Sequence, residues 1–83
     1  MTIYPDINEV EYLRADTNYT VIVRIDGKKV ISGYNLKKVM QLHYQDFIRV
    51  NRAIAVNPAM ISEKTENQIT LINQTFTISR RRR

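Results

Sequence analysis

The sequence predicts a mainly β fold: an arrangement of small antiparallel β-sheets with one short helix. Three observations lead to this prediction. Apolar and polar residues alternate over residues 19–25, Asp26-Gly27 follows directly, and apolar residues recur with a helical period over residues 36–43. A period of two is typical of strands, and the i, i+3, i+4, i+7 spacing is typical of a helix.

Two strands are expected at the start of the chain. Residues 9–15 form the first, with Glu9 and Glu11 on one face. An exposed sheet edge explains these two acids better than a catalytic carboxylate pair. Residues 16–18 are a polar cluster typical of a turn. Residues 19–25 form the second strand, whose alternation gives it two distinct faces.

A hairpin and a helix follow. Asp26-Gly27 is the strongest two-residue turn signal in the chain, so residues 28–32 are expected to return beside the second strand. Asn35 can cap the first turn of a helix, which predicts a helix over residues 36–43. His43 is the only histidine and lies on the apolar stripe of this helix. We therefore expect it to be partly buried rather than catalytic.

The second half of the chain is expected to contain only strands and short turns. Residues 47–50 predict a short strand, and residues 51–57 fit either a helical turn or a bent strand. Residues 59–64, 68–72 and 75–79 predict three strands that form a meander, because only short polar segments separate them.

Composition limits the function classes. The 83 residues make a single domain over residues 1–83, and the chain contains no cysteine and one histidine. We therefore expect no metal and no cofactor. No glycine-rich phosphate loop and no serine with a histidine to activate it can be recognised, so we expect no enzyme. No apolar run is long enough for a membrane span, and no secretory signal is recognised, so a cytoplasmic protein is expected.

Charge is distributed unevenly. The net charge is +5, with an acidic first segment over residues 1–23 and an excess of cations over residues 24–52 and 53–83. Such asymmetry favours a polyanionic partner. Residues 79–83 form a basic C-terminal end, and disorder is expected from Arg82 onward.

The stretch from Phe47 to Asn57 places two arginines among apolar residues. Arg49 has two open interpretations: a structural arginine whose head group bonds backbone carbonyls, or a phosphate contact. Asn51 and Arg52 fall where the chain must turn. Arginine can pair with guanine O6 and N7, and asparagine can pair with adenine, so both are candidates for base contacts.

The chain resembles the LytTR DNA-binding domain of bacterial response regulators and related transcription factors. The matching segments are Phe47-Ile48-Arg49-Val50-Asn51-Arg52, Val56-Asn57, Ile61 and Ile78-Ser79-Arg80-Arg81, preceded by Tyr12-Leu13, Ala15, Asn18-Tyr19-Thr20, Asp26-Gly27 and Asn35-Leu36. The resemblance covers residues 7–81. Asn51 stands where the family usually has histidine, and Ala53 stands where it usually has serine.

The resemblance implies an elongated β fold that inserts loops, rather than a recognition helix, into successive major grooves of double-stranded DNA. It implies three base-reading elements, at Asn18 and Tyr19, at Asn51 and Arg52, and at Arg80. Strand parity places Tyr19 on the face of Val21 and Val23, which favours Asn18 as the side chain that reaches out. The expected phosphate contacts are Lys37, Lys38, Arg49 and Arg81.

The resulting hypothesis is a sequence-specific bacterial transcription regulator related to two-component response regulators, which self-associates on repeated DNA half-sites. The alternative is a small basic β-module that binds RNA or an acidic protein. Few aromatic residues are available for base stacking and most look like core, which argues against single-stranded RNA.

Overall fold

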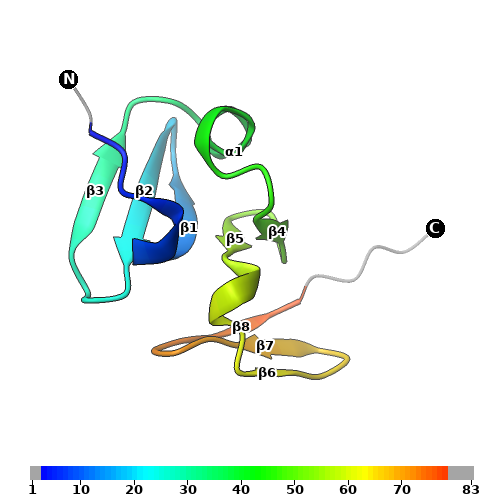
Figure 1. Cartoon of the computed structure of the whole chain (residues 1–83). Coiled ribbons are helices and arrows are strands. Elements are labelled where there is room, and N and C mark those ends of the chain that lie inside the picture. Colours follow the sequence, from blue (N-terminus) through cyan, green and yellow to red (C-terminus); the bar gives the residue numbers. More distant parts are fainter. Residues whose placement is uncertain (1–2, 79–83) are drawn as a thin grey trace.

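The computed structural model describes residues 3–78, which fold into two antiparallel sheets and one α-helix (Figure 1). The elements, in chain order, are the 3-10 helix η1 (Ile7–Glu9), β1 (Val10–Asp16), β2 (Tyr19–Arg24), β3 (Lys29–Ser32), α1 (Leu36–His43), β4 (Ile48–Arg49), β5 (Ile54–Val56), the 3-10 helix η2 (Pro58–Met60), β6 (Glu63–Lys64), β7 (Gln68–Thr70) and β8 (Thr75–Thr77).

The larger sheet has five strands in the order β3-β2-β1-β5-β4, and the smaller sheet is the meander β6-β7-β8. All strand pairs are antiparallel. The described part of the chain extends 38 × 29 × 19 Å. The predicted mainly β architecture with one short helix is therefore confirmed.

The helix and the smaller sheet cover opposite faces of the larger sheet. Leu36 and Val39 of α1 pack in one apolar cluster with Ile22 of β2. On the other face, Val21 and Val23 pack in a second cluster that includes β7. The alternation of β2 is thus real, but both of its faces are buried. The apolar side chains that join the two sheets are Tyr12, Val21, Val23, Val56, Ile69 and Leu71, with Phe76 at the margin.

The helix begins and ends where the sequence predicts. The Asn35 side chain accepts a hydrogen bond from the Lys38 backbone N–H at 2.9 Å, which caps the first turn. The prediction for His43 was wrong, because its side chain is exposed. Its ring stacks on Tyr4, with 3.8 Å between centroids.

The second half of the chain differs from the expectation in three places. The strand at residues 47–50 shrinks to β4, and the backbone N–H groups of Val50 and Asn51 both donate to the Ile54 carbonyl in the turn that follows. The ambiguous residues 51–57 form a loop followed by β5. The strand expected over residues 59–64 was wrong over its first half, where η2 replaces it.

Asn57 explains the appearance of η2. Its side-chain Nδ2 donates to the carbonyls of Ile7 and Val10 at 2.9 and 2.8 Å, and its Oδ1 accepts from the Ala59 backbone N–H at 3.0 Å. The asparagine is 2 % exposed. It therefore fixes the chain reversal after β5 against the start of β1, and the extended conformation cannot continue.

Candidate nucleic-acid interface

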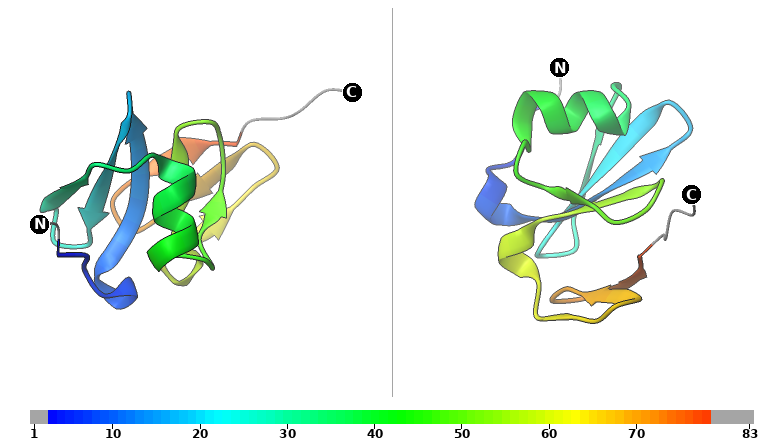
Figure 2. Two further views of the ribbon diagram at one scale, coloured as in Figure 1. Left: turned by 90° about the horizontal axis from the view of Figure 1, so that it is seen from above. Right: turned by 90° about the vertical axis from the view of Figure 1, so that its right-hand side faces the viewer.

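Two loops lie at the same end of the larger sheet. Because β1 is antiparallel to both β2 and β5, the end of β1 lies beside the start of each. The Ala15 backbone N–H donates to the Ala53 carbonyl at 2.7 Å, which joins the β1–β2 turn to the β4–β5 loop. Both lie on the right-hand side of the right-hand view of Figure 2, and β8 ends on the same side. We call residues 16–19, 50–53 and 77–78 the loop edge.

The β4–β5 loop is held by the Asn51 side chain. Its Oδ1 accepts from the Ala53 backbone N–H at 2.9 Å, and its Nδ2 donates to the Thr77 carbonyl at 3.0 Å. The first bond closes a tight local turn. The second attaches the loop to the end of β8, so the two sheets are joined at the loop edge by a directional contact.

Arg49 also holds this loop. Its Nε donates to the Asn51 carbonyl at 3.3 Å, and its Nη2 donates to the Arg52 carbonyl at 2.7 Å. Of the two interpretations of Arg49, the structure shows the contacts of the structural one. The side chain is exposed, and Phe47, expected on the same face, is buried. The predicted two-face alternation fails here because β4 has only two residues.

Arg52 stands apart from its neighbours in the loop. Its carbonyl is bonded by Arg49, but its side chain is exposed and, within residues 3–78, makes no hydrogen bond or ion pair. A guanidinium group on a braced loop is free to pair with an external acceptor. The arrangement gives Arg52 the exposure and the fixed backbone that base recognition requires.

The β1–β2 turn displays the next two candidates. Thr17 adopts a left-handed backbone conformation, with φ of 56°, and the chain then reverses into β2. Asn18 is exposed, and the Tyr19 side chain is 53 % exposed. The alternation of the strand placed Tyr19 on the same face as Val21 and Val23, which the smaller sheet covers. The smaller sheet does not extend over Tyr19. Both side chains are thus accessible at the loop edge.

The third expected element lies beyond the described residues. Arg80 and Arg81 belong to residues 79–83, as do Arg82 and Arg83, for which disorder was expected. The structure does place the segment that leads to them. The Ile78 backbone N–H donates to the Asn67 carbonyl at 2.8 Å, and the Thr77 carbonyl binds Asn51.

Cations on α1 and β4 flank the loop edge on its helical side. Lys37 and Lys38 lie in the first turn of α1, and both are exposed. A shallow groove of about 520 Å³ separates α1 from β4, and its lining residues are Lys37, Met40, Gln41, Gln45 and Arg49. Lys37 and Arg49 thus lie on the two sides of one groove.

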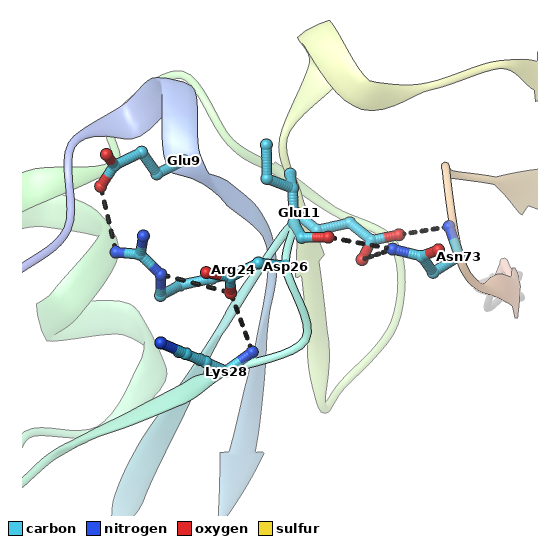
Figure 3. A network of polar contacts seen from close by, with 7 residues as sticks. Glu9, Glu11, Arg24, Asp26, Lys28 and Asn73 are labelled. Carbon is cyan, nitrogen blue, oxygen red and sulfur yellow. Dashed lines mark hydrogen bonds and ion pairs between the residues drawn. The ribbon is translucent and has the colours of Figure 1, made fainter.

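The opposite end of the larger sheet carries paired charges instead. Arg24 bridges Glu9 at 3.0 Å and Asp26 at 3.4 Å (Figure 3). The hydrogen bond from the Lys28 backbone N–H and the nearby charge of Arg24 both lower the pKa of Asp26. Glu9 and Asp26 are therefore paired with Arg24, whereas the Arg52 side chain at the loop edge has no acidic partner within residues 3–78.

A comparison with protein families shows which family the chain belongs to. Residues 2–83 match the LytTr DNA-binding domain. The chain belongs to the LytTR DNA-binding domain family. No curated protein and no solved structure matches it. Membership in the LytTR family supports DNA binding and transcription regulation as its general function, and this family is not an enzyme family.

Other features of this LytTR chain bear on its chemistry. Within residues 3–78, no group of three or more His, Asp or Glu side chains is arranged to hold a metal ion. No helix in the described part of the chain is long and apolar enough to cross a membrane.

The sequence did not reveal the polar residues that hold the LytTR fold together. Asn57 was named only among the segments that resemble the family, and Glu11 was expected at an exposed edge, which was wrong because it is 1 % exposed. The run Val10-Glu11-Tyr12-Leu13 does contain a signal. Tyr12 and Leu13 are adjacent apolar residues that break the alternation, which is typical of a strand buried on both faces.

Proposed function

We propose that the chain binds double-stranded DNA sequence-specifically, by inserting the loop edge into successive major grooves. The observation that carries the proposal is Arg52, exposed and without a side-chain partner within residues 3–78, on a loop braced by Arg49 and Asn51. Successive major grooves on one side of B-DNA are about 34 Å apart. The longest dimension of the described part of the chain, 38 Å, is comparable to this spacing.

The base contacts are assigned by chemistry. Arg52 would pair with the major-groove edge of a guanine. Asn18 and Tyr19, on the β1–β2 turn, would contact bases next to that site. Asn51 uses one N–H and one oxygen lone pair internally, so its amide retains one donor and one acceptor for an adenine. Arg80 would supply the third reading element.

The phosphate contacts would come from the helical side of the loop edge. Lys37 and Lys38 project from α1, and Arg49 borders the groove beside β4. Arg49 retains donors on Nη1 after its two bonds to the loop. Together with Arg81, these cations would position the duplex without reading it.

Within a cell, this domain would act as the DNA-binding part of a cytoplasmic bacterial transcription regulator of the two-component type. Copies bound at repeated half-sites would lie on one side of the duplex, which favours self-association on DNA. Membership in the LytTR family supports these assignments.

Selection of binding sites from a random duplex pool tests the proposal directly. We expect enrichment of two or more short motifs about one helical turn apart, because the loops would enter successive grooves. A pool that yields no motif would contradict sequence-specific binding. Competition with single-stranded RNA and an acidic peptide examines the alternative, since either competitor should displace the duplex if a basic β-module is the correct description.

A further inference from the structure

Glu11 is a buried carboxylate with no cation beside it in the described part of the chain. Its Oε2 accepts from the Asn73 backbone N–H at 2.7 Å, and its Oε1 accepts from Asn73 Nδ2 at 3.2 Å (Figure 3). The same Nδ2 lies 3.4 Å from the Ile25 carbonyl. Burial of an ionised carboxylate is costly unless its hydrogen bonds are satisfied, so Glu11 depends on Asn73.

A β-bulge directs Glu11 to this position. The register between β1 and β2 shifts between Val10 and Tyr12. Val10 and Leu13 belong to the cluster under α1, whereas Tyr12 belongs to the cluster between the sheets. Glu11 and Tyr12 therefore both face the smaller sheet, which is possible only because the bulge inserts one extra residue.

The bond from Glu11 fixes one end of β8. Asn73 lies in the turn between β7 and β8, and the Thr77 carbonyl at the other end of β8 binds Asn51 in the β4–β5 loop. Between these two anchors the sheets meet through apolar side chains. The hydrophobic effect is non-directional, whereas hydrogen bonds fix the direction and distance between two groups.

We propose that Glu11 is a positioning residue for DNA recognition, which sets the position of β8 and, through Asn51, that of the Arg52 loop. The inference rests on the proposed function. Base recognition tolerates displacements of only about 0.5 Å. If the bond between Glu11 and Asn73 were lost, only apolar contacts and the Asn51 bond would hold the smaller sheet. β8 would then move by more than this tolerance while the protein stays folded. Glu11 touches no DNA in this proposal, and its effect is on discrimination between sequences.

The test compares Glu11→Gln with the exchange variant Glu11→Gln/Asn73→Asp. In Glu11→Gln, the amide N–H group of Gln faces the Asn73 Nδ2, which is also a donor, so the side-chain hydrogen bond is lost. In the exchange variant, Gln again accepts from the residue 73 backbone N–H, and its own amide donates to the new carboxylate. The exchange preserves net charge, so electrostatic attraction to DNA is unchanged. Glu9→Gln is the matched control, because it removes an exposed carboxylate that bonds only Arg24 among the described residues.

Binding is measured to the selected duplex and to a scrambled duplex, and amide exchange is measured at the residue 73 N–H. We expect Glu11→Gln to lower the ratio of the two affinities about tenfold, the equivalent of one charged hydrogen bond. Binding to the scrambled duplex should not weaken, and exchange at residue 73 should accelerate. The exchange variant should restore both, and Glu9→Gln should keep the wild-type ratio.

Unchanged discrimination in a folded Glu11→Gln variant with accelerated exchange would overturn the proposal, since the anchor would then be lost without consequence. If Glu11→Gln does not fold, Asn73→Ala replaces it. This variant removes the Nδ2 bonds to Glu11 and to the Ile25 carbonyl, which are the side-chain part of the anchor, and keeps the backbone bond that satisfies the buried carboxylate. A wild-type ratio in folded Asn73→Ala would likewise overturn the proposal, and a reduced ratio would support it. A wild-type protein that selects no motif contradicts the proposed function instead, so the two failures are distinguishable.

Discussion

Replacement of Arg52 by alanine tests the loop edge most directly. The side chain makes no hydrogen bond or ion pair within residues 3–78, so the free energy of unfolding should change by no more than about 0.5 kcal/mol. A bidentate contact with guanine contributes about 1–3 kcal/mol to discrimination. That corresponds to a loss of about 5- to 150-fold in affinity for the selected duplex. Arg52→Lys keeps the charge but loses the planar fork, so it should show most of this loss.

The assay measures binding of wild type, Arg52→Ala and Lys29→Ala to the selected duplex and to variants altered at one position each. Lys29 is an exposed cation at the opposite end of the larger sheet, and it controls for the loss of one charge. Arg52→Ala should bind all four bases at one position almost equally. If it weakens selected and scrambled duplexes by the same factor, as a phosphate contact would, the assignment of Arg52 to a base is refuted.

Three further predictions concern the helix and a buried tyrosine. Lys37→Gln/Lys38→Gln should leave the selected motif unchanged. The slope of log affinity against log salt concentration, measured by titration at several salt concentrations, should become smaller by about one unit per lost phosphate contact. Asn35→Ala removes the cap on Lys38 and should lower the free energy of unfolding by about 1 kcal/mol in denaturant titration. Burial raises the pKa of Tyr44 to about 12, and its hydroxyl donates to the Pro5 carbonyl at 2.8 Å. Because the unfolded tyrosine loses its proton near pH 10, Tyr44 stabilises the fold fully below that pH and progressively less up to about pH 12. Tyr44→Phe should flatten the dependence of unfolding free energy on pH over this interval.

Local sequence determined the elements that depend on near neighbours. The Asn35 cap acts across three residues, and the Asp26-Gly27 turn sets the β2–β3 hairpin, in which Gly27 adopts φ of 89°. These features appear in a short window of sequence, so α1 and the first three strands fall close to the predicted positions.

The remainder depends on contacts between distant residues. Glu11 meets Asn73 across 62 positions, Asn57 meets Ile7 across 50, and Asn51 meets Thr77 across 26. No periodicity within a strand indicates which distant donor will satisfy a buried acceptor. Residue type identified Asn51 and Arg52 as candidates for DNA contact, but the structure was needed to show that Asn51 braces the loop and that Arg52 projects from it.

The two arginines of this stretch therefore make different contacts despite identical chemistry. Val50 and Ile54 are buried on either side of the loop, which leaves the carbonyls of Asn51 and Arg52 pointing outward. Arg49 donates a hydrogen bond to each of these two carbonyls. The Arg52 side chain consequently does not have to fold back to satisfy its own loop.

This division of roles gives a final prediction. Arg49→Lys keeps the charge but cannot bridge both carbonyls with a planar fork, so the loop should loosen and discrimination by Arg52 should fall part of the way toward that of Arg52→Ala. If Arg49 acts through Arg52, the double variant Arg49→Lys/Arg52→Ala should discriminate no worse than Arg52→Ala alone. Losses that add in the double variant would show instead that Arg49 contributes through a separate contact, such as a phosphate.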